Sequence, residues 1–178
     1  MMSEKQGPST RSVHLKNEVD PKMRAITPPV VENTAFAFPD LDVWRAVAYR
    51  EQPGDSYSRN SNPTVRLFAE KMAALEGAES AVAYATGMAA ISTTLFALLS
   101  PGRRAVAVRD AYGATYLHFT KILPRFNIDC RVCDTHDHKA IEAEIAGGCN
   151  VLYLESPTNP TLKILDLQRL IAAAHNAG

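Results

Sequence analysis

The sequence predicts an α/β protein built on a mostly parallel sheet with helices on both faces. Two observations support this prediction. From Ser80 onward, short apolar segments alternate with segments of helical periodicity, and the connections between them are short. The apolar fraction is 46% and the charged fraction 21%, which is typical of a globular chain with a core. Repeated strand–helix units give parallel strands, because each helix returns the chain to the same end of the sheet.

The strands and helices of this alternating region follow from local composition. Runs of small, β-branched or aromatic residues favour strands, and apolar residues three or four positions apart favour helices. The expected strands cover residues 80–84, 105–109, 128–134 and 151–155. The expected helices cover residues 89–100, 115–123, 138–146 and 166–176, with Pro124 ending the second and Gly147-Gly148 the third.

The chain begins with a segment of a different kind. Residues 1–35 are polar and proline-rich, and their apolar end favours an arm that packs on a partner subunit over a disordered tail. Residues 52–63 form a polar loop of turn-forming residues. This loop nonetheless contains Tyr57 and Arg59, although a solvated surface loop is the ordinary interpretation of such a composition.

Two helices are expected in this first part. Residues 40–50 predict a short helix with Asp40 as its N-cap. A second helix has Asn62 as N-cap, Pro63 at its first position and Gly77 just past its end. The expected buried faces are Leu41, Trp44, Val47 and Ala48 on the first helix, and Val65, Phe68, Met72 and Leu75 on the second.

Composition excludes several classes of partner. Lys and Arg number nineteen, as do Asp and Glu, so no net field points to nucleic acid or to a membrane. The apolar runs are too short to span a bilayer, and the polar N-terminus does not resemble a signal peptide. Three cysteines without a disulfide pattern indicate a reducing cytoplasm.

The sequence argues against four other kinds of site. Cys130 and Cys133 with His136 and His138 could suggest zinc, but cysteines three apart on a strand face opposite sides, so no metal site is expected. A Gly-x-Ser-x-Gly elbow and a P-loop are both missing. A nucleotide-binding domain would need a Gly-x-Gly-x-x-Gly turn, which the sequence also lacks.

Several polar residues converge at the carboxyl ends of the predicted strands, where parallel sheets bind ligands. They are Gly87 and Met88 at a helix N-terminus, Tyr112 in the next such loop, and Glu155, Ser156, Thr158 and Asn159 after the last strand. Backbone N–H groups at a helix N-terminus suit a phosphate, and an aromatic ring suits a planar ligand. This set is consistent with a pocket for a flat, phosphorylated heteroaromatic cofactor, although a glycine between strand and helix is more often only a turn.

Five motifs resemble one enzyme family in order and spacing. They are Tyr57-Ser-Arg-Asn-Ser-Asn-Pro-Thr64, Leu75-Glu-Gly-Ala78, Thr86-Gly-Met88, Asp110-Ala-Tyr-Gly113 and Glu155-Ser-Pro-Thr-Asn-Pro160. The chain resembles the N-terminal part of the Cys/Met-metabolism family of pyridoxal-phosphate enzymes. That family includes cystathionine synthases and lyases, methionine γ-lyase and O-acylhomoserine sulfhydrylases. The resemblance extends from about Thr10 to Gly178.

The resemblance implies a fold-type-I, aminotransferase-like architecture. Residues 1–60 would form the N-terminal arm and an inter-subunit cofactor loop, and residues 61–178 the first part of the cofactor-binding large domain. The implied cofactor is pyridoxal 5′-phosphate. Its phosphate would contact Tyr57 and Arg59 of the neighbouring subunit, as well as the backbone of Gly87 and Met88. Tyr112 would stack on its ring and assist proton transfer. Asn159 would face its 3-hydroxyl group, supported by Glu155.

The Schiff-base lysine and the aspartate that pairs with the pyridinium nitrogen would both lie beyond Gly178. The last predicted helix ends where another strand is expected, which indicates a fragment. We therefore expect the 178-residue stretch alone to be nearly inactive. Ala114 stands where relatives carry various small residues, so no subgroup is assigned.

These observations lead to two functional hypotheses. In the first, the complete protein is a pyridoxal-phosphate lyase or transferase that performs β/γ-elimination or γ-replacement on sulfur amino acids such as cystathionine, methionine, cysteine or O-acylhomoserine. It would be cytoplasmic, with a homodimer as the minimal active unit and a homotetramer as the expected assembly, and without nucleic-acid or membrane partners. In the second, the chain is an inert fragment that acts only as a binding or subunit-interaction module.

Overall fold

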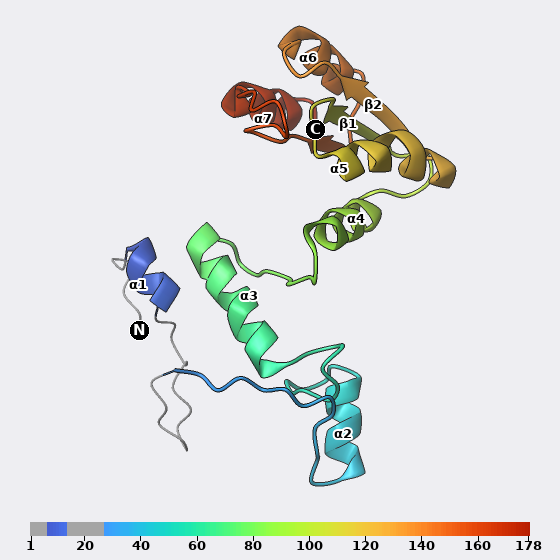
Figure 1. Ribbon diagram of the computed structural model, residues 1–178. Helices are drawn as coiled ribbons and strands as arrows, with labels where there is room; N and C mark the ends of the chain where they lie inside the picture. Colours follow the sequence, from blue (N-terminus) through green and yellow to red (C-terminus); the bar gives the residue numbers. More distant parts are fainter. Residues whose placement is uncertain (1–6, 14–26) are drawn as a thin grey trace. The chain divides into compact units, whose positions relative to one another are not determined.

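The computed structural model describes residues 7–13 and 27–178 (Figure 1). The chain divides into two compact units, residues 1–83 and residues 84–178. Much of the predicted arm, residues 1–6 and 14–26, lies outside the described residues. The sequence analysis divides the chain at residue 60 according to the expected roles of the two parts in cofactor binding. This division stays a prediction.

The first unit contains three helices within its described residues. They are α1 (Pro8–Val13), α2 (Leu41–Ala48) and α3 (Pro63–Glu76). Arg11 of α1 donates a hydrogen bond to the Ala74 carbonyl of α3 at 2.8 Å. An antiparallel bridge pairs Ala35 with Tyr57, so the segment before α2 and the loop before α3 lie side by side.

The predicted N-caps of α2 and α3 and the predicted end of α3 are confirmed, whereas α2 ends at Ala48, two residues earlier than expected. The Asp40 carboxylate accepts a hydrogen bond from Val43 N at 2.8 Å, and the Asn62 amide oxygen accepts one from Thr64 N at 2.9 Å. Gly77 ends α3 in the left-handed conformation with φ of 68°, which glycine adopts without steric cost.

The predicted buried faces of these two helices are wrong for most of their residues. Val47 is buried as expected, but Leu41, Trp44, Val65, Phe68 and Met72 are exposed within this structure. Helical periodicity identifies an apolar face but not what covers it. The described part of this unit has no sheet, so it offers no second layer for these faces.

The second unit is organised around a three-stranded parallel sheet in the order β2-β1-β3. Its strands are β1 (Arg104–Val108), β2 (Asp129–Cys133) and β3 (Val151–Tyr153). Central β1 pairs with both neighbours, so the carboxyl ends of β1 and β3 lie next to each other. The helices of this unit are α4 (Gly87–Leu98), α5 (Gly113–Leu117), α6 (His138–Ala146) and α7 (Leu167–Asn176).

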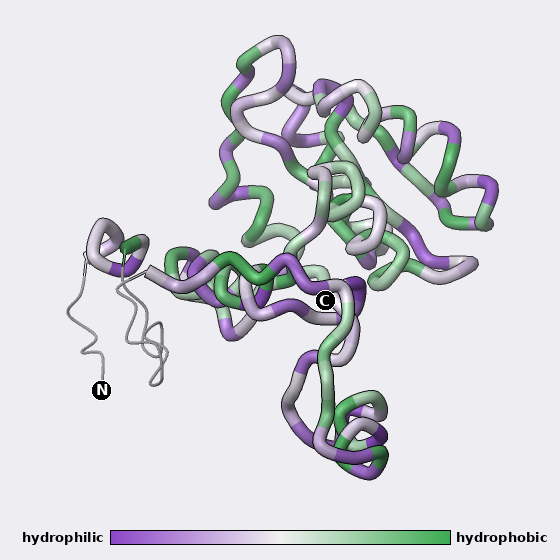
Figure 2. The backbone as a smooth tube through the Cα atoms, turned by 60° about the horizontal axis from the view of Figure 1, so that its bottom comes forward, coloured by the Kyte–Doolittle hydropathy of each residue, from purple (hydrophilic) through white to green (hydrophobic). Residues whose placement is uncertain are grey.

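Side chains of β1 divide the core into two clusters, one on each face of the sheet. Ala105 and Ala107 pack with Leu95 of α4 and with Phe119, which follows α5. Val106 and Val108 pack with α6 and α7 on the other face. The tube in Figure 2 accordingly alternates between hydrophobic and hydrophilic stretches through this unit. The predicted parallel sheet with helices on both faces is confirmed.

The predicted strand at residues 80–84 is wrong. Residues 80–84 form no strand and pair with none of β1, β2 and β3. A strand needs a hydrogen-bonded neighbour, which local composition cannot reveal. The observed β1, β2 and β3 agree with the other three predicted strands to within two residues at each end.

The predicted helix at residues 115–123 does not end at Pro124. Helix α5 continues into a π-helical turn, His118–Ile122, and then a 3₁₀ turn, Leu123–Phe126. Pro124 lacks the N–H that an α-helix needs and its ring would crowd a carbonyl of the preceding turn. The backbone widens before Pro124, where Leu123 N bonds to His118 O, and the chain turns on without breaking.

Candidate cofactor site

The N-terminus of α4 presents backbone N–H groups to open space. The Thr86 hydroxyl caps the helix by accepting a hydrogen bond from Ala89 N at 3.1 Å. The N–H groups of Gly87 and Met88 come before the first helical hydrogen bond and have no carbonyl partner within the helix. A Cβ atom placed on Gly87 would meet nothing within 4 Å, so there is room for a ligand beside this turn.

Tyr112 is the N-cap residue of α5, in the short loop after β1. Its backbone N–H donates to both carboxylate oxygens of Glu155, at 3.1 Å each. Its side chain is 49% exposed, which leaves the ring accessible. Glu155 therefore fixes the main chain of Tyr112 and leaves its ring free to contact a ligand.

The Glu155 carboxylate has a second partner at the end of β3. The Tyr153 hydroxyl donates to Oε2 of Glu155 at 3.2 Å, and the Tyr153 ring packs on Phe119 with centroids 5.3 Å apart. Burial of the phenol, together with the nearby Glu155 charge, raises the pKa of Tyr153 above its ordinary value. Tyr153 therefore stays protonated and donates to the carboxylate.

A contact between helices brings α4 to the same place. The Thr115 hydroxyl of α5 lies 3.5 Å from the Met88 sulfur of α4. Tyr112 is thus bonded to Glu155, and Met88 contacts the helix that Tyr112 begins, at the carboxyl edge of the sheet. The assignment of these residues and of Gly87 to one cofactor site stays a prediction.

Asn159 lies in the loop between β3 and α7, and its side chain is exposed. The loop is closed on itself at Thr158, which is 1% exposed. Thr158 N donates to the Lys163 carbonyl at 3.0 Å, and Lys163 N donates to the Thr158 hydroxyl at 2.8 Å. The neighbour of Asn159 in the chain is therefore firmly anchored, although no contact joins Asn159 itself to Tyr112 or Glu155 in this structure.

One ion pair of this edge was missed by the sequence analysis. Lys163 Nζ lies 2.7 Å from Asp110 Oδ2. Hydrogen bonding to Lys163, and then to Thr135, lowers the pKa of Asp110 below its ordinary value. The available signal was an acidic residue just after one strand and a lysine in the loop after a neighbouring strand, but 53 residues separate them.

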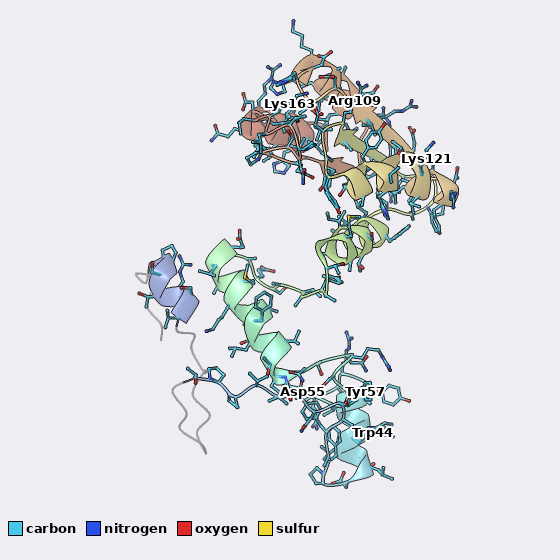
Figure 3. The ribbon with its side chains drawn as sticks, viewed as in Figure 1. Trp44, Asp55, Tyr57, Arg109, Lys121 and Lys163 are labelled. Atoms are coloured by element: carbon cyan, nitrogen blue, oxygen red, sulfur yellow. The ribbon has the colours of Figure 1, made fainter. Side chains whose placement is uncertain are left out.

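Tyr57 and Arg59 lie in the first unit, in the loop before α3; Figure 3 labels Tyr57. The Arg59 guanidinium stacks over the Tyr57 ring, with its carbon 4.8 Å from the ring centroid. Both side chains are exposed, so their polar groups are open to a ligand. Ser58, between them, is held by its N–H to the Thr34 carbonyl at 2.9 Å. The loop is thus an ordered one that presents a phenol and a guanidinium together.

The two cysteines weighed as metal ligands lie on opposite faces of the sheet. Cys130 packs against the cluster that contains Phe119, and Cys133 belongs to the cluster that contains Ile141. Burial raises the pKa of the Cys130 thiol to about 11. No group of three or more metal-ligating side chains occurs within residues 7–13 and 27–178.

These features fit pyridoxal phosphate. The open space and N–H groups at Gly87 suit its phosphate, and the exposed Tyr112 ring suits its planar pyridine. The ring and the helix N-terminus are held near each other by the Met88–Thr115 contact.

No helix of the described residues is long and apolar enough to cross a bilayer.

Two curated proteins are similar to nearly the whole of this chain. L-Methionine gamma-lyase of Pseudomonas putida is 36% identical over 172 residues, which cover 97% of this chain and 43% of the relative. Cystathionine beta-lyase of Bacillus subtilis is 33% identical over 169 residues, covering 95% of this chain and 41% of that protein. The chain thus spans less than half the length of these curated relatives.

Solved structures give the same answer. A putative O-acetylhomoserine (thiol)-lyase of Campylobacter jejuni, which carries a pyridoxyl-lysine phosphate, matches with a TM-score of 0.87 and 30% identity over 97% of this chain and 42% of its own. Cystathionine gamma synthase of Xanthomonas oryzae matches with a TM-score of 0.84 and 31% identity over 97% of this chain and 43% of its own. The sequence model of the family described as "Cys/Met metabolism PLP-dependent enzyme" matches residues 9–178. The chain therefore belongs to the Cys/Met-metabolism family of PLP-dependent enzymes.

Proposed function

We propose that the complete protein is a pyridoxal-phosphate lyase or transferase of sulfur amino-acid metabolism, acting by β- or γ-elimination or by γ-replacement. The observation that supports this proposal is the bond of Tyr112 to Glu155, together with the contact of Met88 with the helix that Tyr112 begins, in a chain that matches the family over residues 9–178. Substrates of the cystathionine, methionine, cysteine and O-acylhomoserine types are the candidates. The covalent lysine is proposed to lie beyond Gly178.

Each site residue has a proposed role. The backbone N–H groups of Gly87 and Met88 bind the phosphate, where the positive end of the α4 dipole favours an anion. Tyr112 stacks on the ring, and Asn159 hydrogen-bonds the 3-hydroxyl with support from Glu155. When bound, pyridoxal phosphate withdraws electrons from the α-carbon of the amino acid, which permits loss of a proton there and of a leaving group at the β- or γ-carbon.

The Tyr112 phenol is the proposed catalytic group within this chain. Its ring is half exposed beside the proposed phosphate site, and its backbone is fixed by Glu155. A phenolic oxygen in this position can hold a proton for the leaving group or accept one from the substrate amine. Because the anchor is through the backbone, the side chain can turn without breaking it.

We also propose that Tyr57 and Arg59 bind the phosphate of a neighbouring subunit, which makes a homodimer the minimal active unit and a homotetramer the proposed assembly. The guanidinium is a planar, bidentate donor suited to phosphate oxygens. A cytoplasmic location is proposed as well, and it is supported by the three cysteines, all of which are free.

The test is a turnover assay on the complete protein purified with pyridoxal phosphate. Each candidate amino acid is supplied in turn, with and without an added thiol. Elimination is measured as release of 2-oxo acid, and replacement as formation of the new thioether with release of the leaving thiol or carboxylate. We expect turnover of at least one substrate, and a loss of about 10²-fold or more in Tyr112→Phe if the phenol moves a proton. An intact mass equal to the 19.4 kDa of this chain, with no bound cofactor, would instead favour the inert binding module.

A further inference from the structure

The proposed ring-stacking residue and the proposed amide come from two different loops. Tyr112 follows β1, and Asn159 follows β3; these strands are paired neighbours, so their loops leave the sheet side by side. A planar ligand that touches both residues needs a fixed spacing between the loops. Exposed loops do not keep such a spacing unless bonds cross between them.

The loop after β3 is a closed unit. Besides the two bonds between Thr158 and Lys163, the Ser156 hydroxyl accepts a hydrogen bond from Leu165 N at 3.1 Å. Leu162 N donates to the Thr158 carbonyl at 2.9 Å. A displacement of Lys163 is therefore transmitted through Thr158 to its neighbour Asn159.

Lys163 is the point at which this closed loop is tied to β1. Its backbone bonds Thr158 in both directions, and its Nζ lies 2.7 Å from Oδ2 of Asp110, two residues after the end of β1. Figure 3 labels Lys163. Asp110 is in turn fixed, since its backbone N–H donates to the Thr135 hydroxyl at 3.0 Å. The Lys163 and Asp110 side chains are only 28% and 20% exposed.

We propose that Asp110 and Lys163 are positioning residues whose ion pair holds the Asn159 loop at a fixed spacing from Tyr112. The inference rests on the proposed function, because it assigns the pair to the same cofactor site. Glu155 gives one link between the two loops through Tyr112 N, and the ion pair gives a second. Two links at different points restrain rotation as well as separation.

An ion pair without this role offers a matched control. Arg169 bonds Glu142 through two nitrogens at 2.5 and 2.7 Å, joining α7 to α6 outside the site loops. Replacing Arg169 with methionine removes an ion pair comparable to that between Asp110 and Lys163. Arg169→Met should therefore change neither cofactor affinity nor the orientation of bound cofactor.

The experiment measures cofactor binding by the complete protein with three variants and this control. Lys163→Met and Asp110→Asn each remove one charge, and Lys163→Arg keeps it. Pyridoxal phosphate is titrated by absorbance, and the visible circular dichroism per bound cofactor reports how its ring is held. Hydrogen exchange of the amides in residues 156–165 is measured on cofactor-free protein.

We expect Lys163→Met and Asp110→Asn to weaken cofactor affinity about two- to fivefold, the range of a partly exposed ion pair. Both should reduce the dichroism and speed exchange in the loop, while Lys163→Arg restores all three readouts. Two independent charge-removing variants guard against a folding defect in one of them. Combining them should be no worse than either alone, because both remove the same bond.

Two results overturn the inference while the proposed function stands. One is wild-type affinity and dichroism in both charge-removing variants. The other is faster loop exchange without any change in bound cofactor, which would make the pair a local support of the loop alone. If wild-type protein binds no pyridoxal phosphate, the proposed function fails and this inference fails with it.

Discussion

Replacing Glu155 with alanine tests whether one carboxylate joins the ends of β1 and β3. The variant removes both acceptors of Tyr112 N and the acceptor of the Tyr153 hydroxyl. A hydrogen bond to a charged group contributes about 1.5–3 kcal/mol, and a neutral one about 1 kcal/mol. Because Tyr112 is half exposed, water replaces part of the first contribution. We therefore expect a loss of about 2 kcal/mol in the free energy of unfolding.

Urea unfolding of the full chain measures this loss. A denaturant slope of about 2 kcal/mol per molar converts it to a midpoint lower by about 1 M. The single tryptophan, Trp44, belongs to the unit of residues 1–83, whereas Glu155 belongs to the unit of residues 84–178. Far-UV circular dichroism is therefore a more suitable signal than tryptophan fluorescence for unfolding of the second unit. Glu155→Gln keeps an acceptor without the charge and should lose about half as much. A midpoint for Glu155→Ala within about 0.2 M of wild type would refute the reasoning.

The same contact has a signature in pH dependence. Folding raises the pKa of Tyr153, so its protonated form stabilises the folded state. This stabilisation is complete below the unfolded pKa and is lost as pH rises through the higher, folded value. In Glu155→Gln the charge is gone but the burial stays, so the Tyr153 pKa should fall and still exceed that of a free tyrosine. An NMR titration of labelled tyrosine rings measures it.

Three further predictions concern separate parts of the chain. Arg59→Ala should weaken pyridoxal phosphate binding by the complete protein at least tenfold while Arg59→Lys weakens it less, since a charged hydrogen bond contributes about 1.5–3 kcal/mol; unchanged affinity in a titration would remove Arg59 from the site. Cys130, with a pKa of about 11, should react with iodoacetamide about a hundredfold more slowly than an unburied thiol at pH 8, as peptide mass spectrometry would show. Arg104→Met should lower the free energy of unfolding by about 2–4 kcal/mol, because the guanidinium bonds the Glu144 and Gly148 carbonyls at the end of α6; a loss no larger than that of the exposed Arg131→Met would contradict this in urea unfolding.

The sequence predicted what depends on neighbours in the chain. Asn62, Pro63 and Gly77 bound α3 because caps act within a few residues, and α6 begins and ends as expected for the same reason. The parallel sheet was predictable because short connections leave few alternatives. The prediction of a strand at residues 80–84 was wrong because strand pairing depends on residues far away in the sequence. The exposed Phe68 shows that an apolar helix face does not reveal which element, if any, packs against it.

The candidate site divides in the same way. Gly87, Met88, Tyr112 and Glu155 were predicted from motifs, and the structure adds a bond between Tyr112 and Glu155 and a contact of Met88 with Thr115 of α5. The Asp110–Lys163 pair was not predicted, since nothing local distinguishes that lysine from others in the chain. Contacts between loops depend on strand order, which places β3 beside β1 although β2 comes between them in the sequence.

The bond between Glu155 and residue 112 separates the main chain of this position from its side chain, because the donor is a peptide N–H that every amino acid except proline supplies. A change of side chain at position 112 therefore leaves this bond in place. A single substitution there alters the reactive group that faces the ligand and leaves the scaffold intact. Chemical specialisation and folding are thus separable at this position, and Tyr112→Phe reports on one oxygen atom alone.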